Sequence, residues 1–342
     1  MEFGIKLPHS GPLASPDAIR RVSWEAEALG YHSVWVHDHI SYGRDWLGHR
    51  ASGLAEQITP EYEPDFYEAV TTLSHVAGTT SSIRLGTSVL VLPLRNPLVL
   101  GRQLLTLQAL SNNRLLLGVG VGDYPDEFQA LNVPYGERGK MVDEYLDVLG
   151  RIFRGGKLQY RGVYCRVDTA WFYPRVTPPP LFIGGGVIAR SEPEQDRLVP
   201  SVLRRVADHG QGWMPDWGSP DLIKEGRATI RRIASQRGDG DPPCSVAFST
   251  ALFLRDSDEE AMAMTLRTIQ AAEAKANVVA KYGTRSLAKY YAKSLIGSPQ
   301  TVQDKIRRYA DAGVELMVMN CLAPNLESYV GMLKRFRAEV VR

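Results

Sequence analysis

Residues 83–120 read IRLGTSVLVLPLRNPLVLGRQLLTLQALSNNRLLLGVG, and this stretch carries the clearest information about the fold. Its two ends, Ile83–Leu92 and Arg114–Gly120, are short apolar runs with the length of buried strands. The segment between them, Asn96–Leu110, has the apolar pattern of a helix. Strands that are apolar along their whole length are typical of parallel sheets, which are covered on both faces. Residues 83–120 therefore predict a strand–helix–strand unit of an α/β protein.

The same alternation of strand and helix continues outward in both directions along the chain. In the helix at Ser15–Leu29, Ser15 is a candidate N-cap, Pro16 occupies the first helical position and Gly30 ends the helix. The other expected strands are Phe3–Leu7, Ser33–Asp38, Leu181–Gly185, Gly212–Met214, Ser245–Leu254 and Val314–Asn320, and the other expected helices are Pro64–Thr79, Glu137–Phe153 and Leu326–Val341. Eight strands alternating with helices favour a (β/α)8 TIM barrel, and an open doubly wound sheet is the alternative.

Three stretches are longer than a minimal barrel requires. They cover residues 154–180, which end in three prolines, residues 187–200, which are polar and charged, and residues 256–297, which have a helical pattern. None has the composition of an interdomain linker. We therefore expect a single TIM-barrel domain over residues 1–342 with loop insertions at these places.

Composition excludes several classes of protein. The 342 residues include 40 Lys and Arg against 38 Asp and Glu, so the formal net charge of +2 predicts no nucleic-acid partner and no membrane partner. Cys165, Cys244 and Cys321 lie far apart, which argues against a disulfide framework or a zinc site. The N-terminal residues lack the pattern of a signal peptide, and no apolar run reaches 18 residues. These features predict a cytoplasmic enzyme.

The first candidate site is the sequence His37-Asp38-His39, which ends the second expected strand. In a TIM barrel the carboxyl ends of the strands face the active site. Two histidines separated by one residue can bind a metal, but no other histidine closes strand five, six or eight, so we expect no metal. The simpler alternative is that Asp38 and His39 only satisfy backbone groups at the rim of the barrel.

Glycines at the ends of later strands mark two further candidates. Gly86–Leu90 places Gly and Ser inside an apolar strand, which indicates a bulge, a close approach by a ligand, or a plain irregularity of the strand. Gly118–Asp123 reads GVGVGD and lacks the dinucleotide fingerprint, but it suits a tight turn beside a flat ligand. Asp123 could act as an acid there or cap the turn that leads to Glu127.

A third glycine cluster, Gly184-Gly185-Gly186, follows the fifth expected strand. Exposed backbone N–H groups of such a run can bind an anion, and Arg190, Arg204 and Arg205 could add positive charge, although a flexible turn explains the glycines equally well. The chain contains no GxSxG elbow, P-loop, HExxH motif or catalytic Cys/His pair, so nucleophilic hydrolysis has no support.

Several segments resemble the luciferase-like monooxygenase superfamily, and in particular its branch that uses the deazaflavin coenzyme F420. The matching segments are FGIKLP (3–8), GYHSVWVHDHI (30–40), residues 83–122, DEFQALNVPYGERGKMVDEYLDVL (126–149), PPPLFIGGG (178–186), HGQGWMP (209–215) and GSPQTVQDKIRRYADAGVELMVM (297–319). They follow one another in order over most of the chain. The F420 branch is indicated mainly by the segment 127–149 and by the Asp38-His39 pair.

The resemblance implies a flat isoalloxazine-type ring at the carboxyl ends of the strands. Asp38 and His39 would flank this ring on the side where substrate arrives. The peptide bond Ser88–Val89 would be cis and would form a bulge behind the ring. His39 is the expected acid or base, because histidine side chains titrate near neutral pH.

The resemblance also implies roles for residues of the later strands. Gly184, Gly185 and Gly186 would line the ring and its ribityl chain, with the phosphate near the helix that contains Arg204. In the sugar-phosphate dehydrogenases of this branch, a Glu at the position of Asp123 is the proposed proton donor. Asp123, which is one methylene shorter than Glu, is the candidate for this role here.

The sequence departs from the family pattern at two places. Gly43 stands where a Trp often follows the rim histidine, and Trp46 could replace that Trp in space. The stretch at residues 187–200 separates the glycine run from Leu203-Arg204-Arg205, so the phosphate contacts are the least secure part of the comparison.

The expected function is that of an F420-dependent oxidoreductase, which transfers a hydride between the deazaflavin and a small organic substrate. The alternative is an FMN-dependent luciferase-like monooxygenase that uses O2 and a partner flavin reductase, and a third reading is a flavin-binding protein without catalysis. Ser41–Pro60 and Ala274–Lys293 are the candidate lids, the second being basic and rich in tyrosine. A homodimer is compatible with all three functions.

Overall fold

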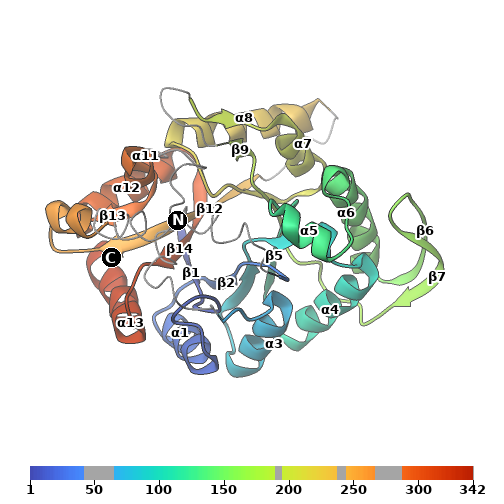
Figure 1. The fold of residues 1–342 in the computed structure, drawn as a ribbon, viewed down its shortest axis with the longest axis horizontal. Coiled ribbons are helices and arrows are strands. Elements are labelled where there is room, and N and C mark those ends of the chain that lie inside the picture. Colours follow the sequence, from blue (N-terminus) through green and yellow to red (C-terminus); the bar gives the residue numbers. More distant parts are fainter. Residues whose placement is uncertain (42–64, 189–194, 237–243, 266–286, 342) are drawn as a thin grey trace.

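The chain forms a closed barrel of eight parallel strands (Figure 1). The computed structural model describes residues 1–41, 65–188, 195–236, 244–265 and 287–341. The barrel strands, in chain order, are β1 (Glu2–Lys6), β2 (Ser33–Val36), β3 (Arg84–Thr87), β5 (Leu115–Gly120), β8 (Leu181–Gly184), β11 (Gly212–Met214), β12 (Ser245–Leu254) and β14 (Val314–Cys321). The last strand, β14, pairs in parallel with both β12 and β1, which closes the ring. The prediction of a (β/α)8 TIM barrel is confirmed, and the open sheet is excluded.

Helices surround the barrel and alternate with its strands. The larger ones are α1 (Pro16–Ala28), α3 (Ala69–Thr79), α4 (Pro97–Leu110), α6 (Arg138–Arg154), α7 (Pro200–His209), α8 (Pro220–Ser235), α12 (Pro299–Asp311) and α13 (Leu326–Arg335). The Ser15 hydroxyl accepts a hydrogen bond from the Ala18 N–H at 3.1 Å, as expected of an N-cap. The predicted helix at Pro64–Thr79 begins only at Ala69, because the carboxylate of Glu68 caps its first turn.

The apolar pattern of the sequence did not predict helices α8 and α12, and α7 was expected only through the family resemblance, as the helix that contains Arg204. Two of them begin with the same Ser-Pro pair that marks α1, since Ser219 and Ser298 are their N-caps. The starting signal was therefore present, but no strongly apolar run follows it. These helices are amphipathic, with charged residues over much of their surface, so their pattern is harder to distinguish from that of a polar loop.

The interior of the barrel is filled by side chains. Its buried cluster consists of Trp35, Leu116, Phe182, Met214, Ala247, Leu316 and Val318. Glycine makes room for the largest of them, because a Cβ at Gly86 would lie 2.2 Å from the ring of Trp35. The indole N–H of Trp35 donates to the Ser33 hydroxyl at 2.7 Å. The barrel is therefore a packed core, and a ligand must bind at its open end.

The three insertions contain more regular structure than the loops that were predicted. Residues 154–180 include an antiparallel hairpin of β6 (Gly156–Arg161) and β7 (Arg166–Phe172). Residues 187–200 include the short hairpin of β9 (Val187–Ile188) and β10 (Arg197–Leu198). The described part of 256–297 includes α11 (Leu287–Lys293) and β13 (Leu295–Gly297), which extends the sheet beside β12.

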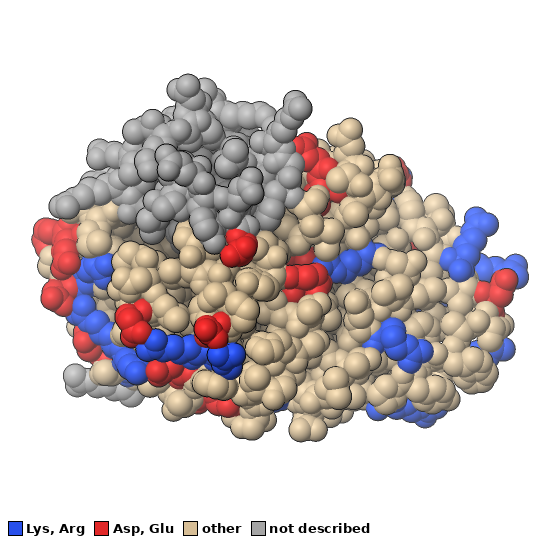
Figure 2. Space-filling view, turned by 60° about the horizontal axis from the view of Figure 1, so that its bottom comes forward, with Lys and Arg blue, Asp and Glu red and all other residues tan. Residues whose placement is uncertain are grey.

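Acidic and basic side chains lie next to one another on the face shown in Figure 2, without one continuous area of either sign. This agrees with the formal net charge of +2. Among the described helices, none has the length and apolar character that crossing a membrane requires.

Candidate active site

Asp38, at the carboxyl end of β2, is buried and engaged on both of its oxygens. Oδ2 accepts a hydrogen bond from the Val91 N–H at 2.9 Å and from Nη1 of Arg95, and Oδ1 accepts from Nη2 of Arg95 at 2.7 Å. Arg95 Nη2 also donates to Glu68 at 2.9 Å. Burial lowers the pKa of Arg95, but the two carboxylates outweigh this effect and raise it. This cluster, Asp38–Arg95–Glu68, fixes the backbone around Val91 relative to the start of α3.

His39 contacts a carboxylate that the sequence analysis did not name as a site residue. Its Nδ1 lies 3.2 Å from Oε2 of Glu127, which is only 1 % exposed and belongs to α5 (Pro125–Ala130). Oε1 of Glu127 accepts the backbone N–H groups of Ile40 and Ser41. Because a carboxylate only accepts, Nδ1 of His39 is the donor in this contact. Glu127 thus orients the imidazole and its backbone together.

Aromatic rings flank His39. Tyr124 lies edge-to-face with it at a centroid distance of 4.7 Å, and Phe66 does so at 6.0 Å. His37, which precedes it in the same strand end, lies 6.1 Å away. The imidazole therefore lies in an aromatic setting whose nearest carboxylate, that of Glu127, is already hydrogen-bonded.

The bulge that the family resemblance implies is present. The Ser88–Val89 peptide bond is cis, and it divides the predicted strand Ile83–Leu92 into β3 and β4 (Leu90–Val91). The side chain of Val89 packs against two other strand ends, since a Cβ at Gly120 or Gly184 would lie 2.6 or 2.7 Å from it. The ends of β3, β5 and β8 therefore converge on Val89. The Ser88 hydroxyl is buried and has no hydrogen-bond partner among the described residues.

The glycine run after β8 lies directly beside the start of α7. Gly185 and Gly186 have φ of +82° and +93°, a region that glycine enters without strain. The Trp213 indole donates to the Gly185 carbonyl at 2.8 Å. The Val199 N–H donates to the Gly186 carbonyl at 2.9 Å, immediately before α7 begins. Residues 187–200 separate the run from this helix along the sequence, as expected, but the pairing of β9 with β10 brings the two together in space.

The two arginines of α7 have different surroundings. Arg205 is buried, and it donates to Asp143 at 2.6 Å and to the Gly139 carbonyl at 3.2 Å, which ties α7 to α6. Arg204 is exposed on the same helix. A contact of Arg204 with a cofactor phosphate stays a prediction.

Asp123 does not cap the following helix. Tyr124 is the N-cap residue of α5 and makes no side-chain capping hydrogen bond, so that alternative is wrong. The Asp123 side chain is exposed, and its carbonyl accepts from the Tyr135 hydroxyl at 3.3 Å. The carboxylate that contacts His39 belongs to Glu127, four residues further along. The role of Asp123 as a proton donor stays a prediction.

Some expected residues lie outside the described part of the chain. They include Gly43 and Trp46, the candidate lid at Ser41–Pro60 beyond its first residue, and residues 274–286 of the second candidate lid. The end of that second segment is described. The ammonium of Lys293 donates to the Asp216 carbonyl at 2.8 Å and lies 4.0 Å from the centre of the Trp217 ring.

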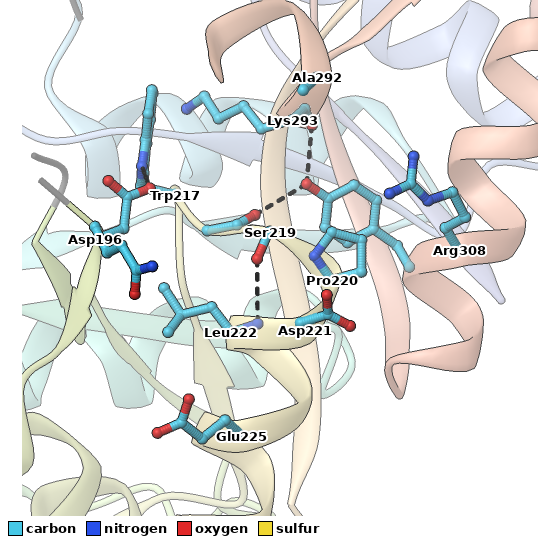
Figure 3. A pocket seen from close by; sticks show the side chains of 13 residues that line it. Asp196, Trp217, Ser219, Pro220, Asp221, Leu222, Glu225, Ala292, Lys293 and Arg308 are labelled. Atoms are coloured by element: carbon cyan, nitrogen blue, oxygen red, sulfur yellow. Dashed lines mark hydrogen bonds between the residues drawn. The ribbon is translucent and has the colours of Figure 1, made fainter. Parts of the chain in front are cut away.

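A pocket of about 480 Å³ opens beside the loop that follows β11 (Figure 3). Trp217 and Tyr309 contribute aromatic surface to it, and Lys293 and Arg308 contribute positive charge. The charged residues on the other walls are acidic, namely Asp196, Asp221 and Glu225. The Trp217 indole donates to Asp196 at 2.5 Å. Two of the insertions, 187–200 and 256–297, therefore help to build this pocket.

These features fit an isoalloxazine-type group. The buried Ser88 hydroxyl lacks a described partner, the cis bond forms the predicted bulge, and the left-handed glycines expose backbone beside a helix start. Ser88 and Val89 follow β3, and the run Gly184–Gly186 lies at the end of β8; these two strands flank β5, and Val89 approaches Gly184 at the same end of the barrel. Asp38 and His39 end the strand next to them. Whether these residues bind the ring stays a prediction.

The sequence of this chain is similar to those of known proteins. The sequence pattern of luciferase-like monooxygenases matches residues 1–316. An uncharacterised protein of Mycobacterium tuberculosis is 28 % identical over 224 residues, which are 64 % of this chain and 71 % of the relative. An F420-dependent glucose-6-phosphate dehydrogenase of Kineococcus radiotolerans is 29 % identical over 191 residues, 54 % of this chain and 51 % of the relative.

Solved structures show the same fold. An F420-dependent secondary alcohol dehydrogenase aligns over 100 % of this chain and 99 % of its own, with a TM-score of 0.76 and 15 % identity. The monooxygenase RslO1 from Streptomyces bottropensis aligns over the same shares, with a TM-score of 0.76 and 22 % identity. Together, the barrel, the bulge and the match over residues 1–316 show that the chain belongs to the luciferase-like monooxygenase family.

Proposed function

We propose that this protein is an F420-dependent oxidoreductase that moves a hydride between the deazaflavin and a small organic substrate. The observation that carries the proposal is the His39–Glu127 contact at 3.2 Å, next to the cis bulge at Ser88–Val89. This contact supports the proposal because His39, with its orientation held by Glu127, would serve as the proton carrier for the reaction. The F420-dependent relative of Kineococcus radiotolerans supports the choice of cofactor.

Some residues of the candidate site would bind the cofactor, and His39 would transfer the proton. Bound F420 supplies or accepts the hydride at its ring carbon. Ser88, Val89 and the run Gly184–Gly186 would hold the ring and its side chain. His39 would give a proton to the substrate oxygen from Nε2 during reduction, or take one during oxidation. Glu127 would accept the Nδ1–H and hold the imidazole in position for this transfer.

The competing function is an FMN-dependent monooxygenase with a partner flavin reductase. Solved relatives with the same fold include a Baeyer-Villiger monooxygenase of Pseudomonas putida in complex with FMN, at 18 % identity and a TM-score of 0.73. Both functions would use a flat ring at the same strand ends. A direct measurement of F420 and FMN binding therefore distinguishes the two functions.

The test is a titration of the purified protein with F420 and, separately, with FMN, followed by absorbance and fluorescence. We expect saturable binding of F420 at micromolar concentration and at least tenfold weaker binding of FMN. Tight FMN binding without F420 binding would refute the proposal. The variant His39→Ala should bind F420 within about twofold of the wild type and lose turnover, and retained turnover would refute the role of His39.

A further inference from the structure

We propose that a second copy of this chain binds to the outward-facing side of α3 and α4, so that the protein forms a symmetric dimer through these helices. The α3–α4 surface is the set of exposed side chains of the two helices, from Thr71 and Gly78 on α3 to Val99, Thr106 and Leu110 on α4. Both helices lie within the described range 65–188. The proposal concerns the side of the barrel and does not depend on which cofactor the protein binds.

The two helices carry almost no charge. α3 has no Asp, Glu, Lys or Arg among its 11 residues, and Arg102 is the one charged residue among the 14 of α4. By contrast, α8 has six charged residues among 16, and α12 has five among 13. The solvent face of a surface helix normally carries charged side chains, whereas the core of a protein interface is depleted of them. The α3–α4 surface therefore has the composition of an interface.

Large apolar side chains are exposed on this surface and beside it. Val99 and Leu110, near the two ends of α4, are 58 % and 69 % exposed. Trp171 at the end of β7 and Tyr173 just after it are 57 % and 49 % exposed. The guanidinium of Arg102 joins the hairpin to α4, because it donates to the carbonyls of Trp171, at 2.8 Å, and Tyr173. A partner that covered these side chains would gain from apolar burial and from aromatic contacts.

Several polar groups of the surface are hydrogen-bonded within their own helix. The Ser74 hydroxyl donates to the Val70 carbonyl at 2.8 Å, and the Thr106 hydroxyl donates to the Arg102 carbonyl at 2.9 Å. A polar group that keeps a partner is far less costly to bury than one that loses its hydrogen bonds to water. These groups could therefore lie against a partner without becoming unpaired.

The middle of the surface leaves space for a helix of the partner. A Cβ at Gly78 would meet no atom within 4 Å, and Ser74, one turn earlier on the same helix, is also small. The distance between two packed helices depends on the side chains at their contact, so small residues allow a close approach. Figure 1 shows α3, α4 and the β6–β7 hairpin next to one another along one side of the barrel.

Charge and size favour a second copy of the chain as the partner. A two-fold axis brings the same surface of both copies together, and a surface without net charge does not repel itself. In Figure 2 the lower middle of the view is mainly tan, with charged side chains on both flanks. The helices are roughly 16 and 21 Å long, and with the hairpin they span roughly 20 by 30 Å. This is the scale of the about 800 Å2 that each partner buries in a stable complex.

Sedimentation velocity of the purified full-length chain, over protein concentrations from about 0.1 to 50 μM, measures the association. We expect a reversible dimer with a dissociation constant at or below about 1 μM. A monomer over the whole range would overturn the proposal.

Two variants locate the contact. Val99→Glu places an acid in the first turn of α4, and Leu110→Lys places a base in its last turn. Both charges interact favourably with the helix dipole, so each variant should keep the circular dichroism spectrum of the wild type. Each should raise the dissociation constant of the dimer at least tenfold, because it buries a charge without a counter-charge. If one variant does not fold, the other decides.

The matched controls introduce the same charges on exposed positions of other helices. Ala228→Glu on α8 and Ala310→Lys on α12 should leave the dissociation constant within twofold of the wild type. A dimer that neither Val99→Glu nor Leu110→Lys weakens would overturn the proposal, because its contact would lie elsewhere. Equal weakening by the controls would also overturn it, since the effect would then not be specific to the α3–α4 surface.

Discussion

His39 and Glu127 are 88 positions apart in the chain, and the structure places Nδ1 of the first 3.2 Å from Oε2 of the second. The same carboxylate accepts the backbone N–H groups of Ile40 and Ser41, so it holds both the imidazole and the chain that carries it. A carboxylate in this position accepts the Nδ1–H and fixes the orientation of the imidazole ring. The orientation of the imidazole therefore depends on a residue outside the strand that carries the histidine.

Replacing that carboxylate should impair catalysis without removing the cofactor site. We expect Glu127→Gln to lower kcat by roughly 10- to 100-fold, because an oriented acid or base contributes on the order of 100- to 10,000-fold. Steady-state kinetics and F420 titration measure the two effects separately. Asp304→Asn, which removes an exposed carboxylate on α12, is the control. Unchanged kcat in Glu127→Gln would contradict the orienting role.

The Asp38–Arg95 ion pair should contribute strongly to stability. The side chains are 0 % and 10 % exposed, and removing one partner of a buried pair leaves the other charge uncompensated. We expect Asp38→Asn to lower the free energy of unfolding by about 3 kcal/mol. Asp147→Asn, which breaks the exposed pair with Arg151, should cost less than about 1 kcal/mol. Urea unfolding measures the free energy of unfolding of both variants. Similar losses in Asp38→Asn and Asp147→Asn would refute the claim that the buried pair contributes more than the exposed one.

The buried Ser88 hydroxyl should matter for cofactor binding more than for folding. Its oxygen has no described partner, so Ser88→Ala should leave the unfolding free energy within about 0.5 kcal/mol of the wild type. Affinity for F420 should fall about fivefold if the hydroxyl binds the ring. Ser23→Ala is the matched control, because the Ser23 hydroxyl donates to the Ile19 carbonyl at 2.7 Å. Ser23→Ala should lose stability and keep its affinity for F420. If Ser88→Ala instead loses stability and keeps its affinity for F420, a cofactor contact at Ser88 is excluded.

Gly184 should tolerate no side chain. A Cβ there would approach Val89 to 2.7 Å and displace the bulge, so Gly184→Ala should weaken cofactor binding by about tenfold or more. Gly136→Ala provides the comparison, because a Cβ at that position meets no atom within 4 Å. Equilibrium titration with F420 distinguishes them, and equal affinities would show that the bulge does not shape the site.

His9 should make the fold sensitive to mild acid. Burial lowers its pKa from 6.5 to about 4, although hydrogen bonds to the carbonyls of Leu7 and His37 act in the opposite direction. The unfolded chain therefore binds a proton between pH 6.5 and 4 that the folded chain does not. Stability should fall by roughly 2–3 kcal/mol across this window, and by less in His9→Asn. His75 is an exposed histidine on α3, and His75→Asn should leave the pH dependence of stability unchanged. If stability falls with pH as steeply in His9→Asn as in the wild type, the assignment of this dependence to His9 is refuted.

Local patterns were sufficient for most of the barrel. The apolar runs of β1, β2, β5 and β12 predict buried strands because burial on both faces selects apolar residues along the whole strand. The Ser15-Pro16 start predicts α1 because an N-cap and a first-position proline act within one turn. The amphipathic helices α8 and α12 were not predicted, since their packing against the barrel gives only a partial apolar stripe, and α7 was expected only through the family resemblance.

The same distinction between local patterns and tertiary contacts applies to the candidate active site. The sequence by itself determined the apolar strands, the strand-end histidine and the glycine runs at the strand ends, because these depend on neighbours in the chain. The cis bond at Ser88–Val89 was predicted only through the family resemblance. Only the tertiary structure decided that Glu127 orients His39 and that Arg95 forms an ion pair with Asp38. It also decided that Gly186 lies beside the start of α7, because β9 pairs with β10. Those contacts join residues that are far apart along the chain, and they form only when the barrel brings its strand ends together.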